Sequence, residues 1–237
     1  MKPLAPVLPT LADVHSTIVS CERCPRLRAY CRRVAEEKKR AHRADTYWGR
    51  PVPGFGDPDA RLLLVGLAPA AHGANRTGRP FTGDGSGDFL MSALHRTGFA
   101  SIATSRRPDD GLRLSDAYIL SAVRCAPPGN KPLPEEITRC LDHLEAELAL
   151  LRRVQVVVAL GKIGFDAWLQ LLRRNGMAPS PRPQFGHGVV VEMSPVLMGC
   201  YHPSRQNTNT GKLTARMMES VFRKAQRILE SFRTLPA

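Results

Sequence analysis

Four short runs rich in valine, isoleucine and leucine stand out along the chain, each bounded by glycine, proline or charged residues. None of these runs alternates strictly between apolar and polar positions. A strand that is covered on both faces has such a continuous apolar run, so we interpret the four runs as buried strands. The predicted strands span residues 61–66, 117–123, 154–160 and 189–198.

The segments between these runs are typical of helices. One follows a Gly-Asp-Gly turn, one opens after Pro134 with Glu135 and Glu136 in its first turn, and the last repeats apolar residues every three or four positions. The predicted helices span residues 86–97, 135–152, 164–175 and 213–232. Strands that alternate with helices predict an α/β fold, in which a mostly parallel sheet lies between helical layers and ligands bind at the carboxyl ends of the strands.

Composition and charge narrow the classes of protein that fit this pattern. The chain has 237 residues, 43% of them hydrophobic, which suits one larger domain or two small ones and excludes a wholly disordered chain. An excess of 34 Lys+Arg over 21 Asp+Glu gives a formal net charge of +13. This excess favours a polyanionic partner, although a basic protein whose charge only keeps it soluble has the same composition. No apolar run approaches the roughly 18 residues of a membrane span, and residues 1–3 open no secretion signal, so we expect a soluble protein with no membrane partner.

Six cysteines, in a chain that we expect to occupy a reducing compartment, favour metal or cluster ligation over a disulfide framework. Cys21 and Cys24 form a C-x2-C pair, Cys125 follows the second predicted strand, and Cys140 lies fifteen positions later on a helix. The four thiolates form one site if the N-terminal segment packs against the Cys125 loop. Four cysteines by themselves do not separate zinc from a four-iron cluster. We expect the other two to be small buried thiols, Cys31 and Cys200.

Two loops rich in small and polar residues follow the first and the last predicted strands. The first reads GLAPAAHG at 66–73 and RPFTGD at 79–84, and the second reads CYHPSRQNTNTG at 200–211. Glycine and proline in the first loop let a ligand approach the main chain closely, and neither nucleotide-binding glycine motif is present. We expect both loops to form a functional surface at the carboxyl ends of the strands.

The segment from Glu36 to Arg50 mixes basic residues with Tyr47 and Trp48. One interpretation is an arm or long loop that contacts a phosphate backbone and a base. The other is a solvated charged helix whose two aromatic side chains fill the core.

The combination of these motifs resembles family 5 (type B) of the uracil-DNA glycosylase superfamily. It joins a strand followed by GLAPAAHG, then RPFTGD, a cysteine after the next strand, and HPSRQNT before a terminal helix, and it covers the chain from Cys21 to about Met218. The resemblance implies a three-layer α/β/α fold with a central parallel sheet of four strands. It implies one domain over residues 1–237, in which residues 1–60 are an N-terminal segment with two cluster ligands. The implied cofactor is a [4Fe–4S] cluster held by Cys21, Cys24, Cys125 and Cys140.

The resemblance also implies roles for single residues. Phe81 matches the aromatic residue on which a flipped uracil stacks, and His202 matches the histidine that donates to O2 of the departing base. The other implied catalytic residues are polar groups near the base and the sugar: Asp84, Asn130 and Asn207. The other base-binding residues are Gly66, Ala68, Ser121 and His72. The DNA-binding residues are Arg76, Arg79, Ser204, Arg205 and Gln206, of which Arg205 and Gln206 wedge into the gap left by the base. Two further lysines are expected to neutralise phosphates: Lys131 and Lys212.

Two positions depart from better-known relatives. Ala68 stands where other families have a side chain that holds the attacking water, and Ser121 stands where they have an asparagine that reads uracil. We therefore expect a largely dissociative reaction with late water capture. Because a serine hydroxyl both donates and accepts, we also expect a pocket that accepts hypoxanthine or xanthine besides uracil.

The resemblance thus predicts a monofunctional DNA glycosylase that hydrolyses the N-glycosidic bond of uracil and other deaminated bases in double-stranded DNA, starting base excision repair. Such an enzyme flips its target base out of the duplex. We expect a monomer in a prokaryotic cytoplasm, associated with the nucleoid. The alternatives are a zinc- or cluster-containing DNA-binding protein without catalysis, and a glycosylase-like protein that binds uracil-containing DNA without turnover.

Overall fold

The computed structural model describes residues 9–232, so the expectation about a secretion signal at residues 1–3 lies outside the described residues. In chain order the elements are α1 (Leu11–Val19), α2 (Pro25–Glu37), η1 (Arg40–His42), β1 (Phe55–Gly56), β2 (Leu62–Gly66), α3 (Ala74–Thr77), α4 (Gly85–Arg96), β3 (Ala117–Ser121), η2 (Pro128–Asn130), α5 (Pro134–Leu148), β4 (Val156–Leu160), α6 (Lys162–Arg174), β5 (Val190–Val191), β6 (Val196–Cys200), α7 (Arg205–Asn209) and α8 (Ala215–Ser231). The predicted helices are confirmed as α4, α5, α6 and α8.

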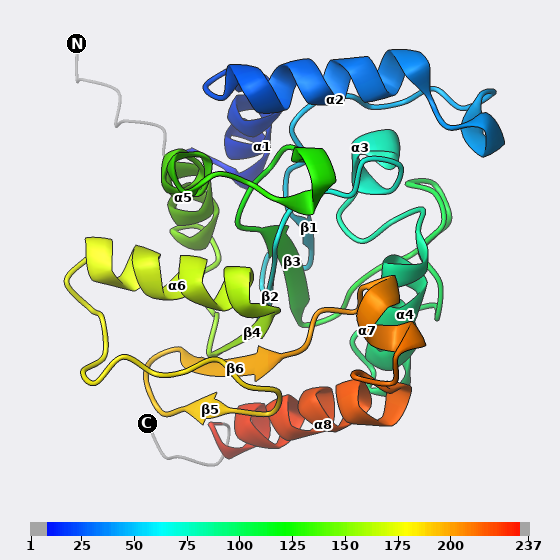
Figure 1. The fold of residues 1–237 in the computed structure, drawn as a ribbon. Helices are drawn as coiled ribbons and strands as arrows, with labels where there is room; N and C mark the ends of the chain where they lie inside the picture. The colour runs from blue at the N-terminus through cyan, green and yellow to red at the C-terminus, as the bar shows by residue number, and fades with distance from the viewer. Residues whose placement is uncertain (1–8, 233–237) are drawn as a thin grey trace, which may run out of the picture.

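The strands form one sheet in the order β1-β3-β2-β4-β6-β5 (Figure 1). Its four inner strands are parallel, with Leu64 of β2 paired to Ile119 of β3 and to Val158 of β4. The predicted α/β fold with a mostly parallel sheet is therefore confirmed. The two-residue outer strands β1 and β5 run antiparallel to their neighbours. No strand is predicted for β1, and the prediction joins β5 to β6, so the sheet has six strands rather than four.

The prediction of a single strand over residues 189–198 is wrong. These residues instead form β5 and β6, which pair as an antiparallel hairpin with Val191 opposite Leu197. Pro195 lies in the connecting turn and has no amide proton to donate to a neighbouring strand. The chain therefore reverses there, and β6 begins at Val196 and continues to Cys200.

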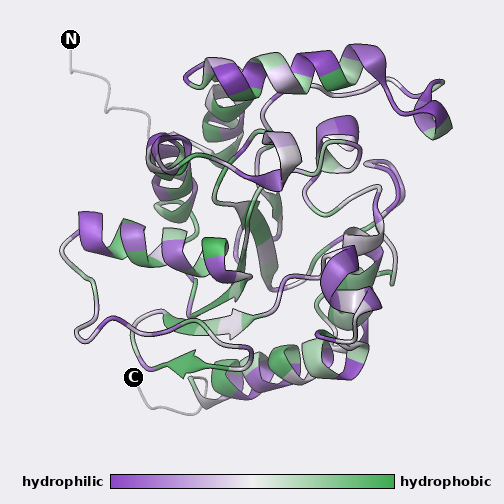
Figure 2. Ribbon diagram, viewed as in Figure 1, coloured by the Kyte–Doolittle hydropathy of each residue, from purple (hydrophilic) through white to green (hydrophobic). Residues whose placement is uncertain are grey.

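Helices cover both faces of the sheet. Leu62 and Leu64 of β2 face the layer that contains α4 and α8, whereas Leu63 and Val65 face the layer of α5 and α6. Because both layers are apolar, the strand has no polar position to alternate with its apolar ones. Figure 2 shows the strands in hydrophobic colours, while hydrophilic residues are frequent on the helices around them.

The N-terminal helices pack beside this core. α1 lies against α5, and α2 contributes Leu27 and Cys31 to a separate buried cluster that also contains Cys125 and Cys140. Cys31 is fully buried there, and Cys200 is fully buried in the main core, as expected for structural thiols.

The segment after α2 forms only the short helix η1 before it turns towards the sheet. Tyr47 is buried, as the core-filling interpretation predicts, whereas Trp48 remains 37% exposed beneath the Arg50 guanidinium. No helix within residues 9–232 is long and apolar enough to cross a membrane.

Candidate active site

A cavity of about 690 Å³ lies at the carboxyl ends of the four inner strands. Ala68 follows β2, Ser121 ends β3, Gly161 follows β4 and His202 follows β6, and all four residues line the cavity. Parallel strands bring their following loops to one edge, which is why residues far apart in the sequence meet here. Nine residues singled out from the sequence line it: His202, Asp84, Asn130, Ala68, Phe81, Ser121, Ser204, Arg205 and Gln206.

Two aromatic rings lie next to each other in the cavity wall. The centroids of Phe81 and His202 lie 5.8 Å apart, with their planes tilted by 34°. Phe81 has a φ of +48°, which a bulky side chain rarely adopts, so the surrounding structure must hold this backbone in place. Gly66 lies behind the Phe81 ring. A Cβ atom at this position would come within 2.9 Å of the Phe81 ring and 3.5 Å of the Ser121 Oγ. Gly66 thus shapes the cavity without lining it.

His202 is held by its neighbours and kept uncharged by its surroundings. Burial lowers the pKa of His202 to about 4, so the imidazole is neutral near pH 7 and has one N–H to donate. Asn207 does not line the cavity; its Nδ2 donates to the His202 carbonyl at 2.8 Å. Gly161 has a φ of +93°, and a Cβ there would lie 3.1 Å from the His202 Cβ. Both residues therefore position His202.

Asp84 is the one acidic residue among the described residues that line the cavity. Its Oδ1 accepts from the Gly87 N–H at 2.9 Å, so the carboxyl caps helix α4. Burial raises the pKa of Asp84. On the other side, a Cβ at Gly73 would come within 2.2 Å of the Asp84 Oδ2, so only glycine leaves room for this carboxyl.

The open side of the cavity carries polar and basic groups. Asn130 is exposed at the end of η2 with a φ of +57°, a conformation that asparagine tolerates better than most residues. Ser204 caps α7, and Arg205 and Gln206 are exposed on its first turn. Lys162, at the start of α6, also reaches the rim and was not singled out from the sequence. Its position directly after the third buried run is the signal that identifies it.

Two predicted site residues lie beside the cavity rather than in its wall. His72 bonds through Nδ1 to the Tyr47 hydroxyl at 3.1 Å, and burial lowers its pKa. Arg76 is largely buried, where it pairs with Asp45 at 2.7 Å and donates to the Gly83 carbonyl at 2.8 Å. These bonds direct the Arg76 guanidinium inward, and its expected phosphate contact stays a prediction.

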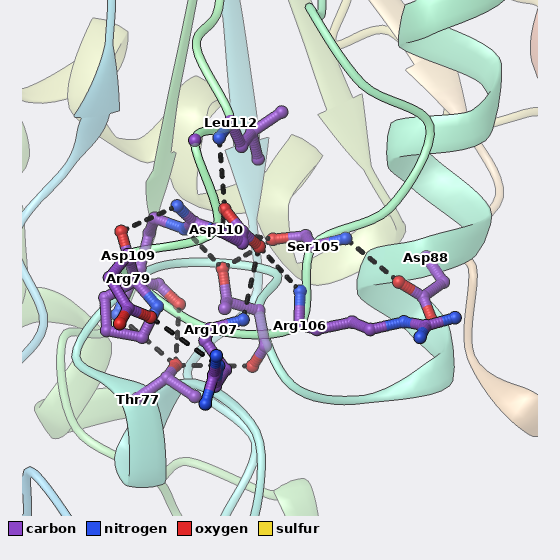
Figure 3. Close-up of polar contacts among 12 residues, drawn as sticks. Thr77, Arg79, Asp88, Ser105, Arg106, Arg107, Asp109, Asp110 and Leu112 are labelled. Carbon is purple, nitrogen blue, oxygen red and sulfur yellow. Dashed lines mark hydrogen bonds and ion pairs between the residues drawn. The ribbon is translucent and has the colours of Figure 1, made fainter.

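Arg79, for which a DNA contact is also expected, is directed inward as well. Its side chain is 6% exposed and pairs with Asp110 at 2.8 Å (Figure 3). It also donates to the Ser105 hydroxyl at 3.1 Å and to the Thr82 hydroxyl at 2.8 Å. Arg79 thus ties the loop after α3 to the loop before β3, and it does not face solvent.

A second cavity, of about 20 Å³, is lined by all four predicted ligands: Cys21, Cys24, Cys125 and Cys140. Burial raises the pKa of Cys24, and it raises that of Cys140 to about 11, so these thiols are uncharged near pH 7 when no metal is bound. No group of three or more histidine, cysteine or acidic side chains within residues 9–232 is arranged to hold one metal ion.

A buried ion pair borders this cysteine cavity. Arg124 lines it, is 1% exposed and pairs with Glu147, which is fully buried. The Arg124 backbone N–H donates to the Cys140 Sγ at 3.3 Å, whereas its Nε and Nη1 atoms have no hydrogen-bond partner among the described residues. Glu147 accepts from the Gly54 N–H at 2.8 Å and from the Tyr118 hydroxyl at 3.1 Å.

The chain belongs to the uracil DNA glycosylase superfamily, whose family model matches residues 53–226. The matched span includes the four inner strands and every loop that lines the large cavity.

Within this superfamily the chain is similar to the type-5 enzymes. It is 49% identical to the type-5 uracil-DNA glycosylase of Mycobacterium tuberculosis over 222 residues, which cover 92% of this chain and 82% of the relative. It is 51% identical to that of Thermus thermophilus over 214 residues, which cover 90% of this chain and 95% of the relative. A type-4 uracil-DNA glycosylase of Pyrobaculum aerophilum is 30% identical over 196 residues, covering 82% of this chain and 83% of the relative.

Proposed function

We propose that this chain removes uracil from double-stranded DNA by hydrolysing the N-glycosyl bond, the step that begins base excision repair. Its family membership makes it a uracil-DNA glycosylase. In this reaction the base departs as an anion while positive charge develops on the sugar, so both charges need stabilisation.

The observation that carries this proposal is the neutral His202 facing Phe81 in a cavity of about 690 Å³. A base flipped from the duplex stacks on Phe81, and the His202 N–H donates to its O2 as negative charge develops there. Because the pKa of His202 is low, the imidazole stabilises the anion by hydrogen bonding without transferring its proton. Asn207 contributes by fixing the backbone of His202.

Asp84 and Asn130 serve the sugar and the attacking water. Ala68 has only a methyl group, which cannot orient water, so the positive sugar forms before water is captured. Asn130 and backbone carbonyls orient that water in this sequence of events. The Asp84 carboxylate, the one acidic side chain of the described cavity wall, stabilises the positive charge.

Ser121 sets the range of bases. It is 6% exposed at the end of β3, beside the Phe81 ring. A hydroxyl donates to one base and accepts from another, whereas an amide presents a fixed pattern. The cavity therefore accepts other deaminated bases such as hypoxanthine and xanthine.

Arg205 and Gln206 fill the space that the flipped base leaves in the duplex. Both are exposed on α7 at the rim, directly after Ser204, which caps that helix. Side chains on the first turn of a capped helix are held in direction, which suits a wedge. Flipping costs a few kcal/mol and costs least at a mispair, so uracil opposite guanine is the favoured substrate.

The cysteine cavity is proposed to hold a [4Fe–4S] cluster through Cys21, Cys24, Cys125 and Cys140. Two features support the fit: all four thiols line one cavity, and the buried Arg124 brings unpartnered N–H groups to it. When bound, the cluster links the N-terminal segment to the loop after β3 and adds negative charge that Arg124 offsets.

A zinc ion and a four-iron cluster place different demands on the four thiols. A single zinc ion needs every thiolate sulfur about 2.3 Å from one metal atom, whereas a cluster provides a separate iron for each thiolate. No described group of three side chains is arranged for one ion, although the four cysteines share a cavity.

Incubation with a uracil-containing duplex followed by alkaline cleavage tests the activity. Strand scission at uracil is expected, followed by scission at hypoxanthine and xanthine in matched duplexes. Tight binding of the uracil duplex with no scission would replace the proposal with a DNA-binding function. Broad absorbance near 400 nm and iron content test the cluster separately, since a zinc protein is colourless.

A further inference from the structure

The connection between α4 and β3 takes an unusual path. Helix α4 starts at the cavity, and the chain just after its end already lies beside the start of β3, where the Ser115 N–H donates to the Phe99 carbonyl at 3.0 Å. A short link would be enough between them. Instead Ser105 lies beside the start of α4: its N–H donates to the Asp88 Oδ1 at 2.9 Å, and its carbonyl accepts from the Gly83 N–H at 2.8 Å. The connection therefore returns along α4 to the cavity edge.

The part of the connection that reaches this edge, residues 105–110, is here called the loop tip. Asp110 holds its shape by accepting from the N–H groups of Arg106 at 2.8 Å, Arg107 at 3.2 Å and Leu112 at 3.1 Å (Figure 3). Burial disfavours its charge, but the Arg79 guanidinium and these N–H groups lower the pKa of Asp110 to about 2. The loop tip is thus built around a permanently ionised and fully paired carboxylate.

The loop tip is joined to the segment that carries the active-site residues. Arg79 binds Asp110 and the Ser105 hydroxyl, and the Thr82 hydroxyl lies 2.7 Å from that of Ser105. Thr82 stands directly after Phe81 and two residues before Asp84. Hydrogen bonds therefore connect the loop tip directly to the segment that positions Phe81 and Asp84.

Two adjacent arginines of the loop tip point their charge at solvent. Arg106 and Arg107 are both exposed, although their backbone N–H groups are fixed. Arg107 pairs with Asp109 at 3.7 Å, but both side chains are 75% exposed, and such a pair contributes little. Asp110, the other acid of the loop tip, is already neutralised by Arg79.

We propose that Arg106 and Arg107 bind two phosphates of the DNA strand next to the flipped nucleotide, on the α4 side of the cavity. The loop tip then takes the role that the sequence assigned to Arg76 and Arg79, both of which point inward. This inference rests on the proposed function, because it names the DNA contact of the same site. A fixed backbone with exposed guanidinium groups suits phosphate binding, which positions a protein on DNA without reading sequence.

The chain contains a matched control. Arg152 and Arg153 are also adjacent and exposed, but they lie in the turn before β4. This turn is at the amino-terminal ends of the strands, whereas the cavity is at their carboxyl ends. The variants R106Q/R107Q and R152Q/R153Q remove the same charge. Any effect of net charge alone is therefore equal in the two variants.

The test is binding of a uracil-containing duplex over a range of salt concentrations, together with excision kinetics. In R106Q/R107Q the slope of log affinity against log salt becomes shallower by about 1 to 2, since each lost phosphate contact removes about 0.9. The excision defect appears as a raised KM, and R106K/R107K restores binding. R152Q/R153Q keeps the wild-type slope.

Equal slopes in the two glutamine variants overturn the inference. So does a defect that the lysine variant does not restore, because the loop tip would then act through its shape rather than its charge. Binding is measured without turnover, so a wild type that binds the duplex but does not cleave it contradicts the proposed function alone. Unfolding temperatures of the variants confirm that the exposed substitutions leave the fold intact.

Discussion

The two cavities of this molecule are built on opposite principles. The base cavity measures about 690 Å³ and is lined by a neutral histidine, one carboxyl and small residues, with exposed polar groups at its rim. The cysteine cavity measures about 20 Å³ and lies against the buried pair of Arg124 and Glu147. The first is open and mostly uncharged, as a site must be that admits and releases a base. The second is small and borders a buried ion pair, as suits a group that stays bound.

This difference predicts how each cavity responds to substitution. In the base cavity the functional side chains come from separate loops and share few hydrogen bonds, so a single replacement there breaks no buried ion pair. Around the cysteine cavity, Arg124, Glu147 and Tyr118 form one bonded network. Replacing one member leaves another buried and unpaired, so effects there are not additive.

The largest expected effect is in the base cavity. H202A removes the donor to the departing base and lowers the single-turnover rate of uracil release by about 10² to 10³. H95A is the matched control. Helix α4 begins at the cavity, whereas His95 is exposed on its last turn, at the other end of the helix. A rate for H202A close to that of H95A contradicts the assignment of His202. Equal unfolding temperatures would show that the loss is chemical.

The second effect tests whether the cysteine cavity depends on charge. R124M leaves Glu147 buried without its partner and is expected to destabilise the protein by about 3–5 kcal/mol. The double variant R124M/E147Q removes both charges, folds better than R124M, and still loses iron about 10 to 100 times faster than wild type under a chelator. The 400 nm absorbance follows that loss.

R139Q is the control for this prediction. Arg139 also lines the cysteine cavity and contacts Cys24, but it is exposed to solvent, where its charge is screened. Iron loss from R124M/E147Q no faster than from R139Q would show that the buried guanidinium does not retain the cluster.

The sequence predicts well those features that depend on local pattern. The inner strands are continuous apolar runs, and the loops after them gather at one edge because the strands are parallel. The outer strands β1 and β5 are two residues long and only half buried, too short for any periodicity to show.

The sequence predicts poorly the features that depend on a distant partner. Arg79 in a polar loop looks like a phosphate ligand, but its direction is set by Asp110, thirty-one positions away. The role of Asn207 as a support for His202 depends on a 2.8 Å contact with a main-chain carbonyl, which no pattern of side chains reveals. The four cysteines were found from their spacing, whereas the Arg124 and Glu147 pair beside them needs the folded chain to become visible.

A smaller effect is expected where the base cavity chooses among bases. S121A removes one hydroxyl that both donates and accepts, and one hydrogen bond contributes about 0.5–1.5 kcal/mol. Release of hypoxanthine relative to uracil is therefore expected to fall by about 2 to 10 times. Uracil serves as the internal control in the same reaction series. An unchanged ratio would assign the choice of base to Phe81 and the main chain.

The smallest expected effect is on the pH dependence of the single-turnover rate. It distinguishes the buried His202 from a histidine with an ordinary pKa. An unperturbed histidine gains its proton near pH 6.5, and a rate that needs the neutral form would fall there. Because burial lowers the pKa of His202 to about 4, the single-turnover rate should stay nearly constant from about pH 8 to about pH 6. Burial raises the pKa of Asp84 above its usual value, so protonation of this carboxylate contributes to the decline on further acidification. In D84N, which keeps an oxygen to cap α4, that contribution is absent, and the decline of the residual rate reports on His202 alone. A wild-type rate that falls through pH 6.5 would mean that His202 has the pKa of an ordinary histidine. Burial would then not be what keeps this hydrogen-bond donor uncharged.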